Sequence, residues 1–219
     1  MKFNLFSNGF YRFFSRIADL MLLNGLFILC CLPIVTVGAS LSALYSVCLK
    51  LVRQEDSYIV KDFFHAFRQN LKHGIILHLI LCVVATIVIT DLVFIWSIMG
   101  ASSLYKGVFF VMLLLSVFFF ITSLYVYPLL AQFTNTTKGY IRNAAILSIK
   151  HFRHTVMFFL LFLLPFAAAL LIPGALSWEF LLFLLFGFSG MVYINSIFFS
   201  GIFRQYIEKE SDDATPTAP

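Results

Sequence analysis

The chain has 219 residues, of which 61% are hydrophobic and only 11% are charged, and its mean hydropathy is +0.97. Soluble domains carry about 25% charged residues, so this chain has too little polar surface to coat a particle in water. Its 15 Lys and Arg outnumber its 10 Asp and Glu, but they lie at the ends of apolar segments, which argues against nucleic-acid binding. The composition predicts a polytopic, all-α membrane protein.

The N-terminal residues 1–19 mix aromatic side chains with Arg12 and Arg16, a composition typical of an interfacial lead-in. The first apolar run, residues 20–49, would form a helix about 45 Å long, half again the thickness of a bilayer core. Pro33 and Gly38 interrupt it. A helix usually stops before proline, and glycine tolerates a turn, so the run predicts a broken helical hairpin.

We expect the break to span residues 33–40, with Pro33 ending the first arm and Gly38 and Ser40 in the turn. Irregular backbone at membrane depth needs partners for its polar groups, so the later helices should cover this turn. Three forms remain open for the run: two short spans, a re-entrant hairpin, or one long tilted span with an outside N-terminus.

Residues 57–73 follow as an amphipathic segment in which aromatic and aliphatic side chains recur at helical spacing opposite Arg68 and Lys72. Such a helix lies in the headgroup plane, attracted to anionic lipid. A similar basic stretch carries Arg142 and Arg153 before a later span. These four cations are candidates for docking a partner or lipid. The two stretches align without a gap, so an internal repeat is a hypothesis.

Four further runs, each long enough to cross a bilayer as a helix, are predicted transmembrane helices: residues 74–99, 107–133, 155–176 and 180–203. The acidic, proline-ended residues 208–219 should form a disordered tail after a single membrane domain of residues 1–207. If both termini are cytoplasmic, all basic residues except Lys106 fall on one side of the membrane. The positive-inside rule therefore predicts both ends in the cytoplasm.

Polar side chains inside apolar runs are functional candidates by default. The sequence offers Asp91, which should lie near the outer interface, His78 near the opposite end of the same span, and the amides Asn24 and Asn195, which suit hydrogen bonds between helices. Signatures of hydrolases, metalloproteases and phosphate-binding loops are missing, and the four cysteines have no metal-ligand spacing. We expect no enzymatic activity, no cofactor and no bound metal.

Several short motifs carry a family resemblance: Arg16-Ile17-Ala18-Asp19-Leu20-Met21, the run from Cys31 to Ser40 that reads C-L-P-I-V-T-V-G-A-S, Ala43-Leu44-Tyr45, Leu51-Val52-Arg53, and the Phe63 to Lys72 stretch. With these motifs the chain resembles the YesL family of small bacterial integral membrane proteins. The family's biochemical function is unknown, and its genes often lie beside sugar importers, carbohydrate-degrading enzymes and sensor kinases. The resemblance implies a plasma-membrane protein and supplies no catalytic residues.

Two functions are consistent with these patterns. The first is an accessory or regulatory subunit that contacts a sugar importer subunit or a sensor kinase through its basic interfacial helices. The second is a self-sufficient transporter or channel whose pathway runs past the break at residues 33–40, where free peptide groups could coordinate a solute. The sparse polar lining favours the first, because a sugar needs several convergent hydrogen-bond partners.

Overall fold

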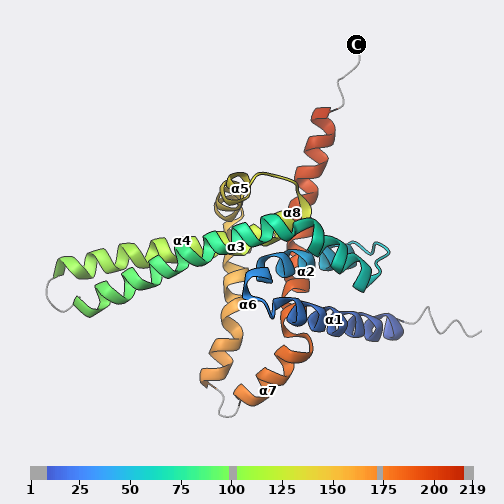
Figure 1. Ribbon diagram of the computed structural model, residues 1–219, viewed down its shortest axis with the longest axis horizontal. Helices are drawn as coiled ribbons and strands as arrows, with labels where there is room; N and C mark the ends of the chain where they lie inside the picture. Colours follow the sequence, from blue (N-terminus) through green and yellow to red (C-terminus); the bar gives the residue numbers. More distant parts are fainter. Residues whose placement is uncertain (1–8, 99–102, 172–174, 215–219) are drawn as a thin grey trace, which may run out of the picture.

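The computed structural model describes residues 9–98, 103–171 and 175–214, and these residues are helical, without strands (Figure 1). The helices are α1 (Gly9–Cys31), a 3-10 turn η2 (Ile34–Thr36), α2 (Val37–Val52), α3 (Ile59–Ile98), α4 (Ser103–Gln132), α5 (Thr137–Lys150), α6 (Phe152–Leu171), α7 (Ala175–Leu182), a π-helical turn η4 (Phe183–Gly187) and α8 (Phe188–Ala214). Within the described residues, six helical stretches are long and apolar enough to cross a membrane.

Helix α2 lies at the centre of the molecule and contacts α1, α3, α4 and α8 (Figure 1). Of its apolar stretch 61% is buried, against 6% in α3 and 6% in α4. Aromatic rings complete the core between α4, α6 and α8: the ring of Phe199 lies 4.8 Å from Phe158 and 5.2 Å from Tyr125. The buried residues are therefore concentrated in α2 and in the halves of α3 and α4 nearest to it.

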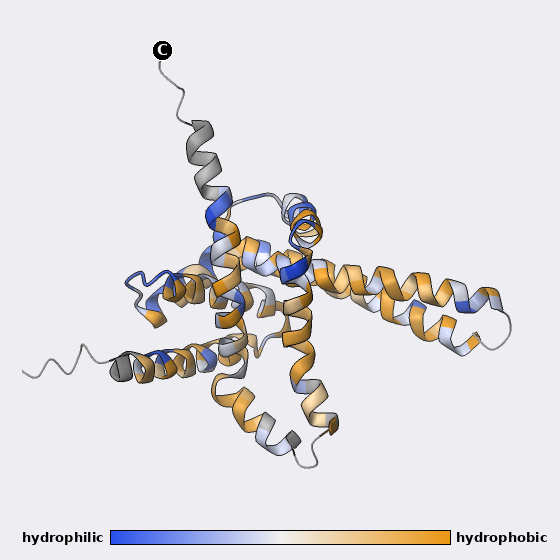
Figure 2. Cartoon of the chain, turned by 180° about the vertical axis from the view of Figure 1, so that it is seen from behind, coloured by the Kyte–Doolittle hydropathy of each residue, from blue (hydrophilic) through white to orange (hydrophobic). Residues whose placement is uncertain are grey.

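Two apolar arms extend from this core in different directions (Figure 1). One is the hairpin formed by the second half of α3 and the first half of α4, and the other is the pair α6 and α7. Figure 2 shows both arms as predominantly hydrophobic. Phe94 on the first arm and Leu164 on the second are each 64% exposed. Apolar side chains presented outward on helices are the surface that lipid, rather than water, would cover.

The break in the first apolar run lies earlier than expected. Helix α1 ends at Cys31 and α2 begins at Val37, so the interruption surrounds Pro33. Gly38 and Ser40 were expected in the turn but lie buried inside α2. Gly38 serves close packing instead: a Cβ there would meet the carbonyl oxygen of Gly74 on α3. A helix can begin directly after the 3-10 turn, so glycine is not needed to reverse the chain.

Later helices do not cover the tip of the break, contrary to expectation. Leu32 is 75% exposed and Ile34 is 76% exposed. The polar groups find partners within the hairpin itself. The hydroxyl of Thr36 donates to the carbonyl of Cys30 at 2.7 Å, and the hydroxyl of Ser40 donates to the same oxygen at 3.0 Å. These two side chains replace the backbone donors that the break removes, so outside cover is unnecessary.

Four further boundaries differ from the sequence expectations. The amphipathic residues 57–73 and the span after them form one continuous helix, α3, about 60 Å long. The second basic stretch is divided at His151, between α5 and α6, so the two proposed repeat units differ in backbone form. Helix α1 already begins at Gly9, and α8 continues to Ala214, into the stretch expected to be disordered. Residues 1–8 and 215–219 lie outside the described part.

Candidate functional site

The four docking candidates lie on the polar helices and are exposed to solvent. Arg68 and Lys72 lie on α3, Arg142 on α5 and Arg153 at the start of α6. Helices α3 and α5 contact each other, with the rings of His73 and Tyr140 6.2 Å apart. Among the described residues, none of the four cations forms an ion pair or a side-chain hydrogen bond. We call these four residues the basic face.

Other cations of the same region are used within the chain. Lys50 at the end of α2 forms an ion pair with Asp62 on α3, with 3.3 Å between nitrogen and oxygen. Arg53 donates to the side-chain oxygen of Gln132 at 2.9 Å and lies 3.8 Å from Glu55. These contacts join the end of α2 and the loop after it to the start of α3 and to the end of α4. The basic residues thus divide into a structural set and an unpaired, exposed set.

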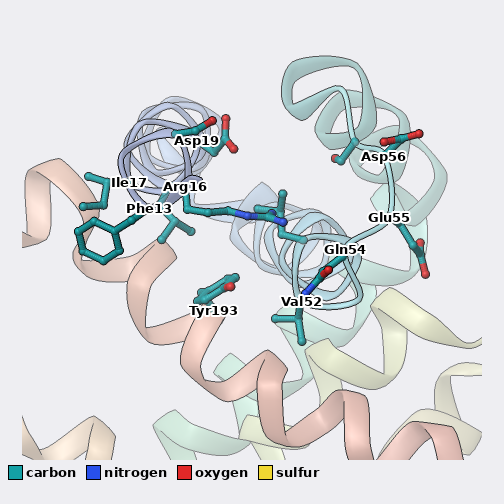
Figure 3. Close-up of a pocket in the computed structure, with 13 residues that line it drawn as sticks. Phe13, Arg16, Ile17, Asp19, Val52, Gln54, Glu55, Asp56 and Tyr193 are labelled. Carbon is teal, nitrogen blue, oxygen red and sulfur yellow. The ribbon is translucent and has the colours of Figure 1, made fainter. Parts of the chain in front are cut away.

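A polar pocket of about 790 Å³ lies between α1, the loop after α2 and α8 (Figure 3). Arg16 extends from α1 into the space between the helices, and Asp19 lies on the same helix (Figure 3). Asp56 lines it from the loop and Tyr193 from α8. The loop turns sharply at Gln54, whose φ of 58° is in the left-handed region. With a guanidinium and carboxylates among its lining residues, the pocket suits a polar group of a ligand or partner.

Sequence reasoning missed this pocket because its walls come from three distant parts of the chain. The clustering of Arg16 and Asp19 one helical turn apart was the available signal. By itself, that spacing does not distinguish a pocket wall from a solvated helix face.

Asn24 is fully buried in α1 and joins it to η4 and to the start of α8. Its amide nitrogen donates to the carbonyls of Phe183 and Leu184, at 2.9 Å and 2.8 Å, and its oxygen accepts from the backbone N–H of Ser189 at 3.1 Å. The π-helical turn Phe183–Gly187 shifts the regular hydrogen-bond pattern and frees such groups. The side-chain amide of Asn24 therefore supplies hydrogen-bond partners for the backbone groups freed by the π-helical turn. All three of its hydrogen bonds are made to backbone atoms.

The other intramembrane candidates do not join Asn24 in one site. The Nδ1 atom of His78 lies 2.9 Å from the hydroxyl of Tyr127 on α4. The side-chain oxygen of Asn195 on α8 is buried beside Tyr45 of α2. Asp91 lies half-buried in the outer part of α3, with no ion pair or hydrogen bond to any described residue. Each of these side chains has its own surroundings, so the structure does not combine them into a binding centre.

Among the described residues, no group of three or more His, Cys, Asp or Glu could hold a metal ion. The four cysteines are free thiols. Cys48 is buried in the core, whereas Cys82 is exposed.

A family model described as "Protein of unknown function, DUF624" matches residues 20–92. This region runs from α1 through the break and α2 to the outer part of α3. It includes the close approach of Gly38 to Gly74 and two members of the basic face, Arg68 and Lys72. Searches of curated proteins and of solved structures found no match. The family description and the apolar helices indicate a membrane protein whose biochemical activity this match does not supply.

Proposed function

We propose that this protein is an accessory or regulatory subunit of the bacterial plasma membrane that docks a partner through the basic face. The observation that carries the proposal is the division of its cations. Lys50 and Arg53 are committed to contacts inside the chain, while Arg68, Lys72, Arg142 and Arg153 are exposed and unpaired among the described residues. Exposed cations without internal partners contribute little to folding and are available to steer and orient a partner.

The proposal places the basic face and both termini in the cytoplasm. Its first support is the concentration of basic residues in the segments that would face that side. The two apolar arms leave the core in different directions (Figure 1), so the proposed placement rests on the charge distribution. Anionic lipid of the inner leaflet would then contact the same helices.

For the partner we propose a sugar importer subunit or a sensor kinase, which is the association that the resemblance to the YesL family implies. Nothing in the described surface favours nucleic acid. The transporter alternative is less well supported, because polar groups at the break between α1 and α2 already form hydrogen bonds within the chain. The Cys30 carbonyl already accepts hydrogen bonds from Thr36 and Ser40, and Gly38 packs against α3. A solute would therefore find few free peptide groups there.

The test is purification of the tagged protein from gently solubilised native membranes, followed by mass spectrometry. We expect stoichiometric recovery of an importer subunit or sensor kinase with the wild type, and loss of that partner when Arg68, Lys72, Arg142 and Arg153 are all replaced by Gln. The matched control is Lys106→Gln, an exposed cation near the tip of the α3–α4 arm. Because these charges also orient the chain, sidedness is measured in parallel. Full partner recovery by a correctly oriented fourfold variant would refute docking through the basic face.

A further inference from the structure

A second cavity, of about 480 Å³, lies where α4 ends and meets α5 and α8. Its lining residues divide by type into apolar side chains, among them Leu129, Phe133 and Phe203, and polar ones, among them Asn143, Lys150 and Tyr206. The volume is within the range of small-molecule pockets, about 300–1,000 Å³. An elongated amphiphile with a polar head matches this division of the walls.

The charge of the lining favours an anion. Lys150 is the only charged side chain among the described residues that line the cavity. Its ammonium lies 4.9 Å from the centre of the Tyr206 ring, a contact that orients the cation without neutralising it. No carboxylate in the described lining competes for Lys150. The described lining of the cavity therefore carries one positive charge and no carboxylate.

The loop between α4 and α5, which lines the cavity, is held in place by hydrogen bonds. The hydroxyl of Tyr140 donates to the Phe133 carbonyl at 2.7 Å and accepts from the backbone N–H of Asn135 at 2.9 Å. The rings of Phe133 and Phe203 lie 5.1 Å apart. Because the loop between α4 and α5 is held in this way, the cavity exists before a ligand binds, which reduces the ordering cost of binding.

The position of the cavity in the fold indicates which kind of amphiphile it would bind. The cavity adjoins the end of the candidate membrane span in α4. It is also lined by α5, which is not among the candidate membrane spans. It thus lies where an apolar segment gives way to polar helices. Basic pockets between helices at such a boundary recognise anionic lipid headgroups.

We infer that this cavity binds one anionic phospholipid, with the headgroup phosphate at Lys150 and Asn143 and the start of an acyl chain along Leu129, Phe133 and Phe203. The inference rests on the proposed membrane placement but is independent of the docking partner. Lys150 does not belong to the basic face, so binding of lipid and loss of partner can be measured separately.

The test is native mass spectrometry of the delipidated protein in detergent, titrated with phosphatidylglycerol and, separately, with phosphatidylcholine. We expect one phosphatidylglycerol to bind in preference to phosphatidylcholine. Lys150→Gln should weaken phosphatidylglycerol binding about fivefold, the loss expected for one cation near the headgroup. Lys150→Arg should retain most of the affinity, and Lys106→Gln, which removes an exposed cation far from the cavity, should retain all of it.

Three outcomes would overturn the inference. One is equal binding of phosphatidylglycerol by wild type and Lys150→Gln, provided circular dichroism shows that both are folded. Another is displacement of the lipid by glycerol 3-phosphate at matched concentration, because a soluble phosphate that binds equally well would make the acyl chain irrelevant. A wild type that binds both lipids equally would also contradict the assignment of Lys150 to an anionic headgroup.

Discussion

The contact between Gly38 and Gly74 gives the sharpest prediction about the fold. A Cβ at position 38 would meet the Gly74 carbonyl oxygen and lie 2.8 Å from the Cβ of His78. A Cβ at position 74 would lie 2.7 Å from the Cα and the backbone nitrogen of Ala39. Neither set of atoms is the flexible end of a side chain, so α2 and α3 would have to separate.

We therefore expect Gly38→Ala to destabilise the protein. Overpacking costs about 1–3 kcal/mol in packed cores, and contact with backbone favours the upper part of that range. Alanine regains up to about 1 kcal/mol of helix propensity relative to glycine. The net expectation is a loss of about 1–2 kcal/mol. Small residues permit this kind of close helix contact in membranes, so Gly74→Ala should behave in the same way.

The measurement is the free energy of unfolding in mixed micelles. Gly25→Ala on α1 is the matched control, because no heavy atom lies within 4 Å of its added Cβ. This control should be neutral or stabilised by up to about 1 kcal/mol. If Gly38→Ala and Gly25→Ala changed the free energy equally, the proposed tight contact between α2 and α3 would be wrong.

Two further predictions concern polar side chains. Asn24→Leu removes three hydrogen bonds, two to η4 and one to α8. At about 0.6 kcal/mol for each bond in a membrane protein, this substitution should lower the free energy of unfolding by about 2 kcal/mol. An unchanged free energy of unfolding would contradict a stabilising role for the three hydrogen bonds. Burial, followed by the charges of His154 and Lys150, lowers the pKa of His151 from its ordinary 6.5. The folded protein thus favours the neutral ring, so stability should be greatest above the ordinary pKa and fall as the pH drops below it. His151→Gln should flatten this dependence in thermal unfolding across that range, and an unaltered profile would exclude His151 as its source.

Much of the helical organisation could be predicted from the sequence. The four later apolar runs each overlap a candidate span, and Pro33 marked the interruption between α1 and α2. The exposure of Arg68 and Lys72 also followed from helical periodicity, because the apolar positions of α3 repeat on the face packed against α2. These properties depend on local sequence alone.

Features that depend on distant partners could not be predicted. A glycine in an apolar run is compatible with both a turn and a close helix contact, and only the position of Gly74 decides between them for Gly38. Asn24 was a candidate for joining helices, but its partners are backbone groups freed by a π-helical turn, which has no signature in the sequence. The pocket beside Arg16 and Tyr193 forms only when α1 and α8 come together.

The central claim is that the basic face contacts a partner protein in the membrane, and site-directed photocrosslinking tests it most directly. A photoreactive residue would replace Gln69, which is exposed between Arg68 and Lys72, and in a second variant Ser103, at the tip of the α3–α4 arm. The account predicts a defined protein adduct from position 69 in native membranes and none of that mass from position 103. Adducts that are the same from both positions, or only lipid adducts from position 69, would contradict it.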